Sequence, residues 1–336
     1  MQITGIDRAD DSLVEQCWGV WDRSSAASRV VPHRYSLEEF AKEVRFTFPG
    51  EHDLLTVALG SGRVLGLARV WFPERDNQTL CWAELQVDPA HRGRGVGAAL
   101  LRRLEDAARD EGRSLLLLDA FVRPEERETG RARRFAERRG FTLSNVEIVR
   151  HLELPVPPER LDALEESARS AVGSAYDVQV YLDDGVPEAL RQSLCDCSNR
   201  LALDAPSGEV DFEAESMTPA DYAELLEHER DTGGRRLTAL AVERATGVVA
   251  AYTALALPAG DLEVAHQWGT LVLPEHRGHR LGMAVKVANI RRLQRFDPQR
   301  KRIDTCNAEL NPWMVQINVD LGFQVVEELL SMKKDL

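Results

Sequence analysis

Short apolar segments in the first half of the chain predict a series of β-strands. Residues 54–60 (LLTVALG) and 62–72 (GRVLGLARVWF) are joined through a Ser-Gly pair, which is typical of a hairpin turn. Residues 80–87 (LCWAELQV) predict a third strand, and a glycine- and arginine-rich phrase, HRGRGVGAAL, follows at 91–100. Apolar residues then recur at helical spacing up to Gly112, so we expect a glycine loop that opens a long helix.

The same half continues with a strand, a helix and another extended segment. Residues 114–121 (SLLLLDAF) form a continuous apolar run, as strands covered on both faces do. A shorter helical pattern at 131–138 ends before Gly140, and Phe141 begins the next extended stretch. The predicted order is therefore three strands, a glycine loop, a helix, a strand, a helix and a strand.

The second half repeats this order. Its glycine phrase is HRGHRLGMAV at 276–285, and Gly322-Phe323 stands where the first half has Gly140-Phe141. A duplication explains two such phrases in the same strand–loop–helix context better than chance does. The other strands and helices expected in this half fall at 237–243, 247–257, 263–273, 301–307 and 312–321.

Residues 154–168 (LPVPPERLDALEESA) mark a boundary between the halves. Their prolines favour an extended spacer, and a charged helical pattern follows. We therefore expect an N-terminal domain over 1–154, a linker over 155–172 and a C-terminal domain over 173–336. Each domain is long enough to bury its own core.

Composition narrows the class of protein. The 336 residues carry a net charge of −13, which argues against a nucleic-acid-binding surface. Because no apolar run is long enough for a transmembrane helix and no signal peptide is visible, we expect a cytoplasmic protein without membrane contact. Five scattered cysteines predict neither a disulfide framework nor a metal site. We expect a monomer, since two fused domains can mimic a dimer.

The glycine phrase has the properties of an anion site. A strand that feeds a glycine-rich turn at the start of a helix directs backbone N–H groups at one point, beside the positive end of the helix dipole. Arg92 and Arg94, or Arg277 and Arg280 in the second copy, would add positive charge for phosphate groups. The chain contains neither the Gly-Lys-Ser/Thr of a P-loop nor the G-x-G-x-x-G of a βαβ unit.

The run RGRGVG at 92–97 resembles the acetyl-CoA-binding signature Q/R-x-x-G-x-G/A of the GCN5-related N-acetyltransferases (GNAT), and the likeness extends over both halves. It implies an α/β (α+β) protein with two tandem GNAT folds, each a mixed, mostly antiparallel, splayed sheet flanked by helices. It also implies acetyl-CoA as cofactor, with the pantetheine in the split of the sheet and the pyrophosphate on the loop. The implied cofactor-binding residues are Val87, Arg92, Gly93, Arg94, Gly95, Val96 and Gly97 in the first half, and Val272, Arg277, Gly278, His279, Arg280, Gly282 and Asn311 in the second.

Both halves depart from the family pattern. Arg280 replaces the middle glycine of the second loop, and Thr129 replaces the asparagine that Asn311 supplies in the second half. Asn318 and Ala136 stand where family members often carry a tyrosine that can protonate the departing thiolate. These departures leave open which half is active.

Acetyl transfer to an amine needs a proton acceptor near the split. The resemblance places this group on the fourth strand, where His266 lies eleven residues before the loop arginine. Histidine is the residue type whose charge changes near neutral pH, so it suits the role of a base. Glu263 is an alternative base in the same half. In the first half, Glu84 and Gln86 are expected on one face of the strand, so Glu84 is the candidate there. Cys81 matches His266 in position and is expected to be a packed thiol.

The resemblance implies an acetyl-CoA-dependent N-acetyltransferase that transfers an acetyl group to a small-molecule amine by direct attack on the thioester. Two alternatives stay open: a catalytically degenerate acyl-CoA-binding or regulatory protein, and an acyltransferase that uses a longer acyl-CoA. The acidic composition favours a cationic acceptor. Lys286, in the helix after the second loop, is expected on a solvated face, and Trp21 either in the core or in the wall of an acceptor pocket.

Overall fold

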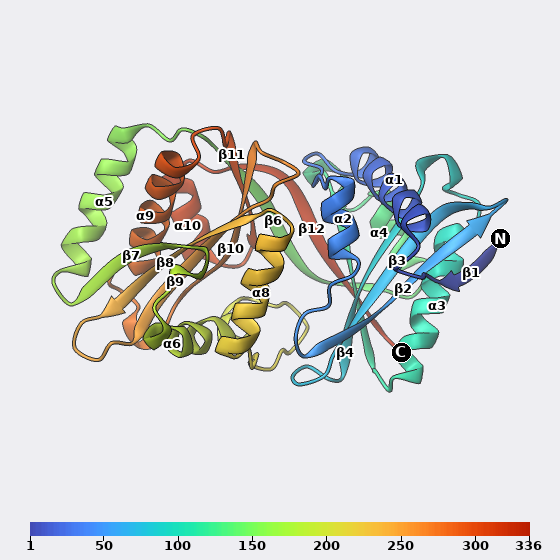
Figure 1. Ribbon diagram of the computed structural model, residues 1–336, viewed down its shortest axis with the longest axis horizontal. Coiled ribbons are helices and arrows are strands. Elements are labelled where there is room, and N and C mark those ends of the chain that lie inside the picture. Colours follow the sequence, from blue (N-terminus) through green and yellow to red (C-terminus); the bar gives the residue numbers. More distant parts are fainter. The chain divides into compact units, whose positions relative to one another are not determined.

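The computed structural model describes residues 1–336, which form two compact units (Figure 1). The first unit comprises Met1–Glu147, Ser207–Asp211 and Val326–Leu336. The second unit comprises Ile148–Pro206 and Phe212–Val325. No helix of the structure has the length and hydropathy needed to cross a membrane.

This division differs from the expected domain boundaries in two places. Most of the expected linker is helix α5 (Pro158–Val172), and its Leu161 is buried in the core of the second unit. The extended proline segment is confined to residues 154–157, and the charged helix that the sequence predicts begins at Pro158, because proline at the first turn of a helix removes no intrahelical hydrogen bond. In addition, the segment Val326–Leu336 belongs to the first unit, although the sequence order places it in the second half.

The first unit is built on a mixed sheet. Neighbouring strands are antiparallel except β4 and β5, which are parallel. The expected mixed, mostly antiparallel architecture is therefore confirmed. In order across the sheet, the strands are β1 (Gln2–Gly5), β2 (Glu51–Gly60), β3 (Arg63–Pro73), β4 (Leu80–Val87) and β5 (Leu115–Val122).

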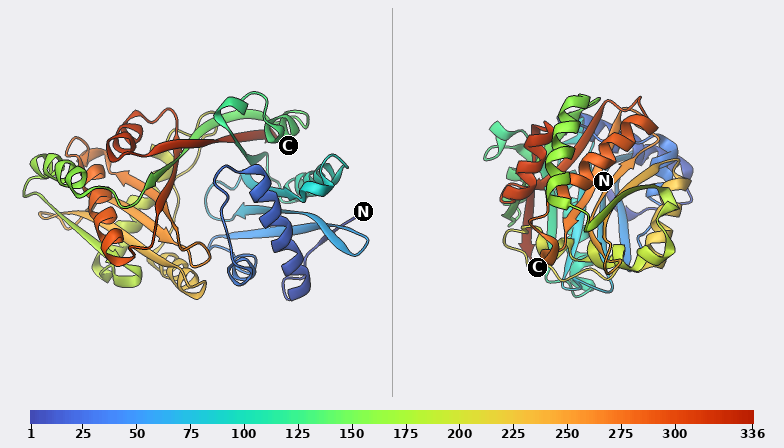
Figure 2. Two further views of the ribbon diagram at one scale, coloured as in Figure 1. Left: turned by 90° about the horizontal axis from the view of Figure 1, so that it is seen from above. Right: turned by 90° about the vertical axis from the view of Figure 1, so that its left-hand side faces the viewer.

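Helices cover both faces of this sheet. Side chains of β2 and β3 point alternately to the two faces, so Leu55 and Val57 pack with α1 and α2, whereas Ala68 and Val70 pack with α3. Figure 2 shows the dark blue α1 crossing the light blue strands. The four helices are α1 (Asp11–Ser28), α2 (Leu37–Glu43), α3 (Val96–Asp110) and α4 (Arg131–Glu137).

The sixth strand of the first unit comes from the far end of the chain. Strand β12 (Gln324–Asp335) pairs antiparallel with β5, from Glu328 opposite Val122 to Asp335 opposite Leu115. Figure 1 shows this red strand running to the C-terminal label. Leu330 and Met332 are completely buried in the same core as α3 and β5, so the segment is an integral part of this unit.

The second unit repeats the architecture. Its cores are formed by α6 and α8 on one face of the sheet and by α9 with α5 on the other. The strands, in order across the sheet, are the part of β6 (Thr142–Glu153) after Glu147, β11 (Arg302–Ala308), β10 (Val264–Val272), β9 (Val249–Leu257), β8 (Arg235–Glu243) and β7 (Tyr176–Leu182). The helices are α5, α6 (Glu188–Asn199), α7 (Leu201–Asp204), α8 (Pro219–Asp231), α9 (Leu281–Phe296) and α10 (Pro312–Leu321).

Candidate active site

The first glycine phrase forms an open turn between β4 and α3. Gly93 and Gly95 have φ angles of 77° and 85°, in the left-handed region that favours glycine, and a Cβ atom at either would meet open space. Gly95 is the N-cap of α3 and provides no side-chain cap. The N–H groups of the first helical turn, which begins at Val96, therefore face an unobstructed space suited to a phosphate group. This local geometry fits the pyrophosphate of a CoA cofactor.

The last glycine of each phrase, Gly97 or Gly282, has a different role, close packing. A Cβ at Gly97 would lie 3.1 Å from the Phe135 ring, and one at Gly282 would lie 3.1 Å from Ile317 Cδ1. Phe135 and Ile317 occupy matching positions in α4 and α10, six residues before the Phe of each Gly-Phe pair. The duplication seen in the sequence therefore extends to individual packing contacts.

The loop arginines predicted to bind phosphate are engaged within the protein. Arg92 Nε donates to the carbonyl of Val87 at 3.1 Å, and Arg277 Nε donates to that of Val272 at 3.3 Å. Arg92 also donates to Ser24 Oγ at 2.9 Å. These two arginines brace the turn against the end of the preceding strand, whereas Arg94 is exposed beside the first turn.

The second turn is more crowded with side chains. Gly278 has a φ of 87°, but Arg280 also adopts the left-handed region, with a φ of 54°, as the N-cap of α9. For a residue with a Cβ this conformation costs about 1 kcal/mol. Arg280 donates to Ser167 Oγ, and the His279 ring lies 5.5 Å from the ring of Tyr176. Asn311 caps α10 by accepting the N–H of Met314 at 3.1 Å.

Each sheet opens next to its glycine turn. In the first unit, parallel pairing of β4 and β5 runs from Leu80–Leu115 to Ala83–Leu118 and stops there. Glu84 and Asp119 are the next residues on the two strands. In the second unit, pairing of β10 and β11 stops after Gln267–Thr305. The splay that the resemblance implied after the fourth strand is therefore present in both units.

Glu84 lies at the point where the first sheet opens. Its Oε1 accepts hydrogen bonds from Trp21 Nε1 at 3.3 Å and from Gln86 Nε2 at 3.0 Å, so Glu84 and Gln86 share a face as predicted. Gln86 Oε1 accepts from Ser24 Oγ at 2.6 Å, and Arg92 donates to the same Ser24 hydroxyl. A continuous set of hydrogen bonds thus connects this exposed carboxylate to the glycine turn.

The second unit has no carboxylate at the equivalent place on its fourth strand. Gly269, like Glu84, lies eight residues before the loop arginine, and the Tyr252 hydroxyl occupies the space where a side chain at Gly269 would begin. His266 lies within the paired part of the strand, opposite Asp304. Glu263 precedes β10 and forms an ion pair with Lys301, so it lies at the closed end of this strand pair and does not reach the split.

Lys286 is buried, with only 1% of its surface exposed, so the expected solvated face is wrong. Its Nζ donates to Asn318 Oδ1 at 2.9 Å, and Asn318 donates to Asn307 Oδ1 at 2.9 Å. Burial, together with the nearby Arg150, lowers the pKa of Lys286 to about 7. The spacing of Met283 and Ile290 already placed position 286 on the apolar face of this helix, which is the signal that could have revealed it.

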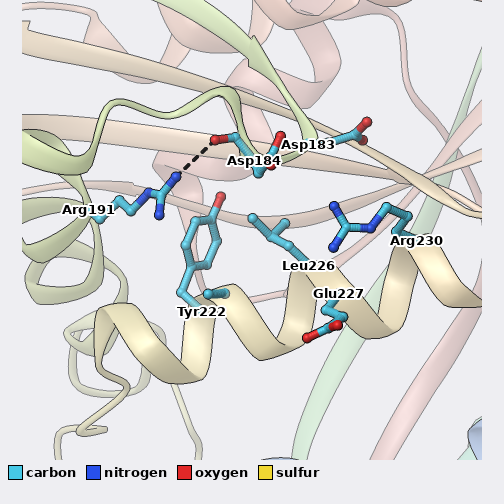
Figure 3. Close-up of a pocket in the computed structure, with 8 residues that line it drawn as sticks. Asp183, Asp184, Arg191, Tyr222, Leu226, Glu227 and Arg230 are labelled. Carbon is cyan, nitrogen blue, oxygen red and sulfur yellow. Dashed lines mark hydrogen bonds between the residues drawn. The ribbon is translucent and has the colours of Figure 1, made fainter.

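One pocket of about 210 Å³ opens in the second unit, between α8, the start of α6 and residues 183–184 (Figure 3). Arg191 closes one side by donating to the carbonyl of Asp184 at 3.1 Å, and the buried hydroxyl of Tyr222 has no hydrogen-bond partner. None of the site residues predicted from the sequence lines this pocket.

Comparisons with known proteins agree with this architecture. Residues 51–143 match the family model described as an acetyltransferase (GNAT) domain. No match was found among curated proteins. The chain is similar to the structure of a tandem GNAT protein from the clavulanic acid biosynthesis pathway, with 24% identity, a TM-score of 0.78 and coverage of 99% of this chain and 98% of that one. A GCN5-related N-acetyltransferase from Sphaerobacter thermophilus matches with 16% identity, a TM-score of 0.65 and coverage of 99% and 95%.

The chain therefore has the fold of tandem GNAT proteins, and its residues 51–143 match the model of an acetyltransferase (GNAT) domain. The matched range contains β2 to β5, the first glycine turn and both strands of the first split.

Proposed function

We propose that the protein is an acetyl-CoA-dependent N-acetyltransferase that acetylates a small-molecule amine, and that the transfer takes place in the first unit. The observation that carries the proposal is the position of Glu84, which lies at the opening of the sheet and is connected by hydrogen bonds to an open glycine turn. The match to a GNAT acetyltransferase domain over 51–143 supports the same unit.

The residues of this unit suit direct transfer. The N–H groups at Gly95 and the start of α3 would bind the pyrophosphate of acetyl-CoA, whose thioester supplies the acetyl group. Holding donor and acceptor together in the split reduces the barrier mainly through proximity. Glu84 attracts the ammonium form of the acceptor, and a carboxylate at the split takes its proton as it becomes a nucleophile.

A second candidate role applies to the second unit, as a CoA-binding module without turnover. This unit keeps an open glycine at Gly278 but has Gly269 where the first unit has Glu84. In this proposal His266, which the sequence suggested as a base, contributes to the sheet and not to proton transfer.

Matched substitutions in the two turns test the proposal. Gly93 and Gly278 occupy equivalent positions, both have a positive φ, and both have open space where a side chain would start. Tryptophan at either position therefore imposes similar backbone strain but fills a different anion site. We expect Gly93→Trp to remove acetyl-CoA binding in the first unit and to abolish acetyl transfer, and Gly278→Trp to leave transfer unchanged.

Binding is measured by calorimetry with acetyl-CoA, and transfer by thiol release with a panel of primary amines. Loss of transfer in Gly278→Trp alone would move the reaction to the second unit and restore His266 as the candidate base. If the wild-type chain does not bind acetyl-CoA at all, the proposed function is wrong.

A further inference from the structure

Asp119 is the second carboxylate at the opening of the first sheet. It follows Leu118, the last residue of β5 that pairs with β4, just as Glu84 follows the last paired residue of β4. Its side chain is exposed at the split, and its Oδ1 accepts a hydrogen bond from Ser331 Oγ at 3.1 Å. Two carboxylates from adjacent strands therefore face the place where the strands part.

The two carboxylates differ in their surroundings. Glu84 Oε1 already accepts N–H groups from Trp21 and Gln86. Asp119 accepts one hydroxyl and forms no ion pair, and its Oδ2 has no hydrogen bond within the protein. The charged groups that face it are also acidic: Glu84 from β4 and Glu147 from β6. Of the two carboxylates, Asp119 therefore has fewer hydrogen bonds to compensate its negative charge.

These surroundings change the basicity of Asp119. The carboxyl is open to the split but otherwise enclosed by protein. This desolvation, added to repulsion from Glu147 and Glu84, raises its pKa to about 6, although the Ser331 hydroxyl acts in the opposite direction. A carboxylate in this range is ionised at neutral pH and still accepts a proton readily, which suits a general base.

The second unit provides an internal comparison. Cys81 and His266 occupy matching positions on the fourth strands of the two units, and they pair with Leu116 and Asp304. Three residues further along β5 and β11, Asp119 therefore corresponds to Asn307. Asn307 is a neutral amide whose Oδ1 accepts from Arg150 at 3.1 Å and from Asn318 at 2.9 Å. The second unit therefore lacks a carboxylate on both strands at the split.

We propose that Asp119 is the catalytic base of the transfer in the first unit and that Glu84 holds the acceptor as an ammonium ion before the proton leaves; this rests on the proposed function. The proton moves from the acceptor nitrogen to Asp119 Oδ2, and the freed electron pair forms the N–C bond to the acetyl carbonyl carbon. The C–S bond breaks with its electron pair on sulfur, and the nitrogen gives up its second proton as the amide forms; the sulfur takes up that proton and leaves as the CoA thiol. Asp119 then returns its proton to water.

The test compares Asp119→Asn with the wild-type chain on two nucleophiles. Putrescine is protonated at neutral pH and needs a base, whereas hydroxylamine is already unprotonated. We expect Asp119→Asn to bind acetyl-CoA normally and to lose about 100-fold or more in the putrescine reaction, with a much smaller loss with hydroxylamine. Asp106→Asn, on the exposed face of α3, is the matched control and should behave as wild type.

Titration of the carboxyl group gives a readout that does not depend on activity. Carbon-13 NMR of aspartate-labelled full-length chain, compared with Asp119→Asn, should show one carboxyl that titrates near pH 6. Ser331→Ala removes the only hydrogen bond to this group and should move the titration to higher pH. Titration near the ordinary aspartate value, or equal losses with both nucleophiles, would overturn the role of Asp119 while leaving the proposed function intact. Absence of acetyl-CoA binding to the wild-type chain would instead refute the proposed function.

Discussion

Truncation of the chain after Val325 is expected to unfold the first unit. The missing segment contains Leu330 and Met332, both completely buried, and the whole ladder of hydrogen bonds to β5. Removing one such side chain from a core costs about 2–5 kcal/mol. A domain of this size has a total stability of about 5–15 kcal/mol, so loss of the entire strand exceeds what the unit can tolerate.

Ion pairs at the start of the segment add to this loss. Glu327 Oε1 accepts a hydrogen bond from Arg29 Nη2 at 2.5 Å, and Glu328 Oε2 accepts one from Arg127 Nε at 2.7 Å. Both glutamate side chains are almost fully buried. Truncation would leave the two arginines without these partners. Amide hydrogen exchange of α3 and β5 is the measurement, because it reports on this unit separately.

A milder pair of substitutions serves as the control for the truncation. Leu330→Ala should destabilise the first unit by about 2–5 kcal/mol. Val325→Ala, at a position that is 54% exposed just before the segment, should have little effect. Unchanged protection of α3 and β5 in the truncated chain would show that the segment is not needed for this fold.

Replacement of Lys286 by methionine is expected to stabilise the second unit at neutral pH. The pKa of Lys286 is lowered from its ordinary value of 10.5 to about 7 by burial and by Arg150. At a pH between these two pKa values, Lys286 carries a proton in the unfolded chain but not in the folded chain. The stability of the wild-type unit therefore rises with pH across this window, and the cost of the buried lysine is greatest at pH 7 and below.

Methionine has a similar length and no charge, so it removes this cost. Each unit by which the pKa of Lys286 is lowered corresponds to about 1.4 kcal/mol of unfolding free energy. Loss of the hydrogen bond to Asn318 costs about 1 kcal/mol. The net gain in the free energy of unfolding at pH 7 is therefore about a few kcal/mol. The gain should shrink towards pH 10. Lys42→Met, at a surface ion pair with Glu38, is the control and should show no such trend. Urea unfolding at several pH values measures both variants, and a pH-independent difference for Lys286→Met would contradict the argument.

The repeated strand and helix pattern was sufficient to predict two similar folds, because each element carries its own periodicity. The same reasoning found Glu84, whose alternation with Gln86 placed both on one face. Asp119 was visible as the single charged residue within SLLLLDAF, but a continuous apolar run favours a buried strand and gives no sign that the sheet opens beside it. That information lies in the pairing between two strands and not in either strand alone.

Other features depend on contacts between distant residues. Arg92 and Arg277 look like phosphate ligands in the sequence, yet each donates to a strand carbonyl five residues earlier, because the turn brings the side chain back over the strand end. From its place in the sequence, directly after α10, β12 would be expected to belong to the second half. Its pairing with β5 depends on the path of the chain, which local propensity does not determine.

The position of β12 also sets an order of events during protein synthesis. The ribosome makes Met1–Glu147 first, but this unit lacks a central part of its core until Val326–Leu336 has been made. The edge of β5 therefore stays unpaired while the entire second unit is translated. On this basis the first unit reaches its native state only after the second unit has been made, and the interval before that is when the nascent chain is most open to aggregation or to chaperone binding.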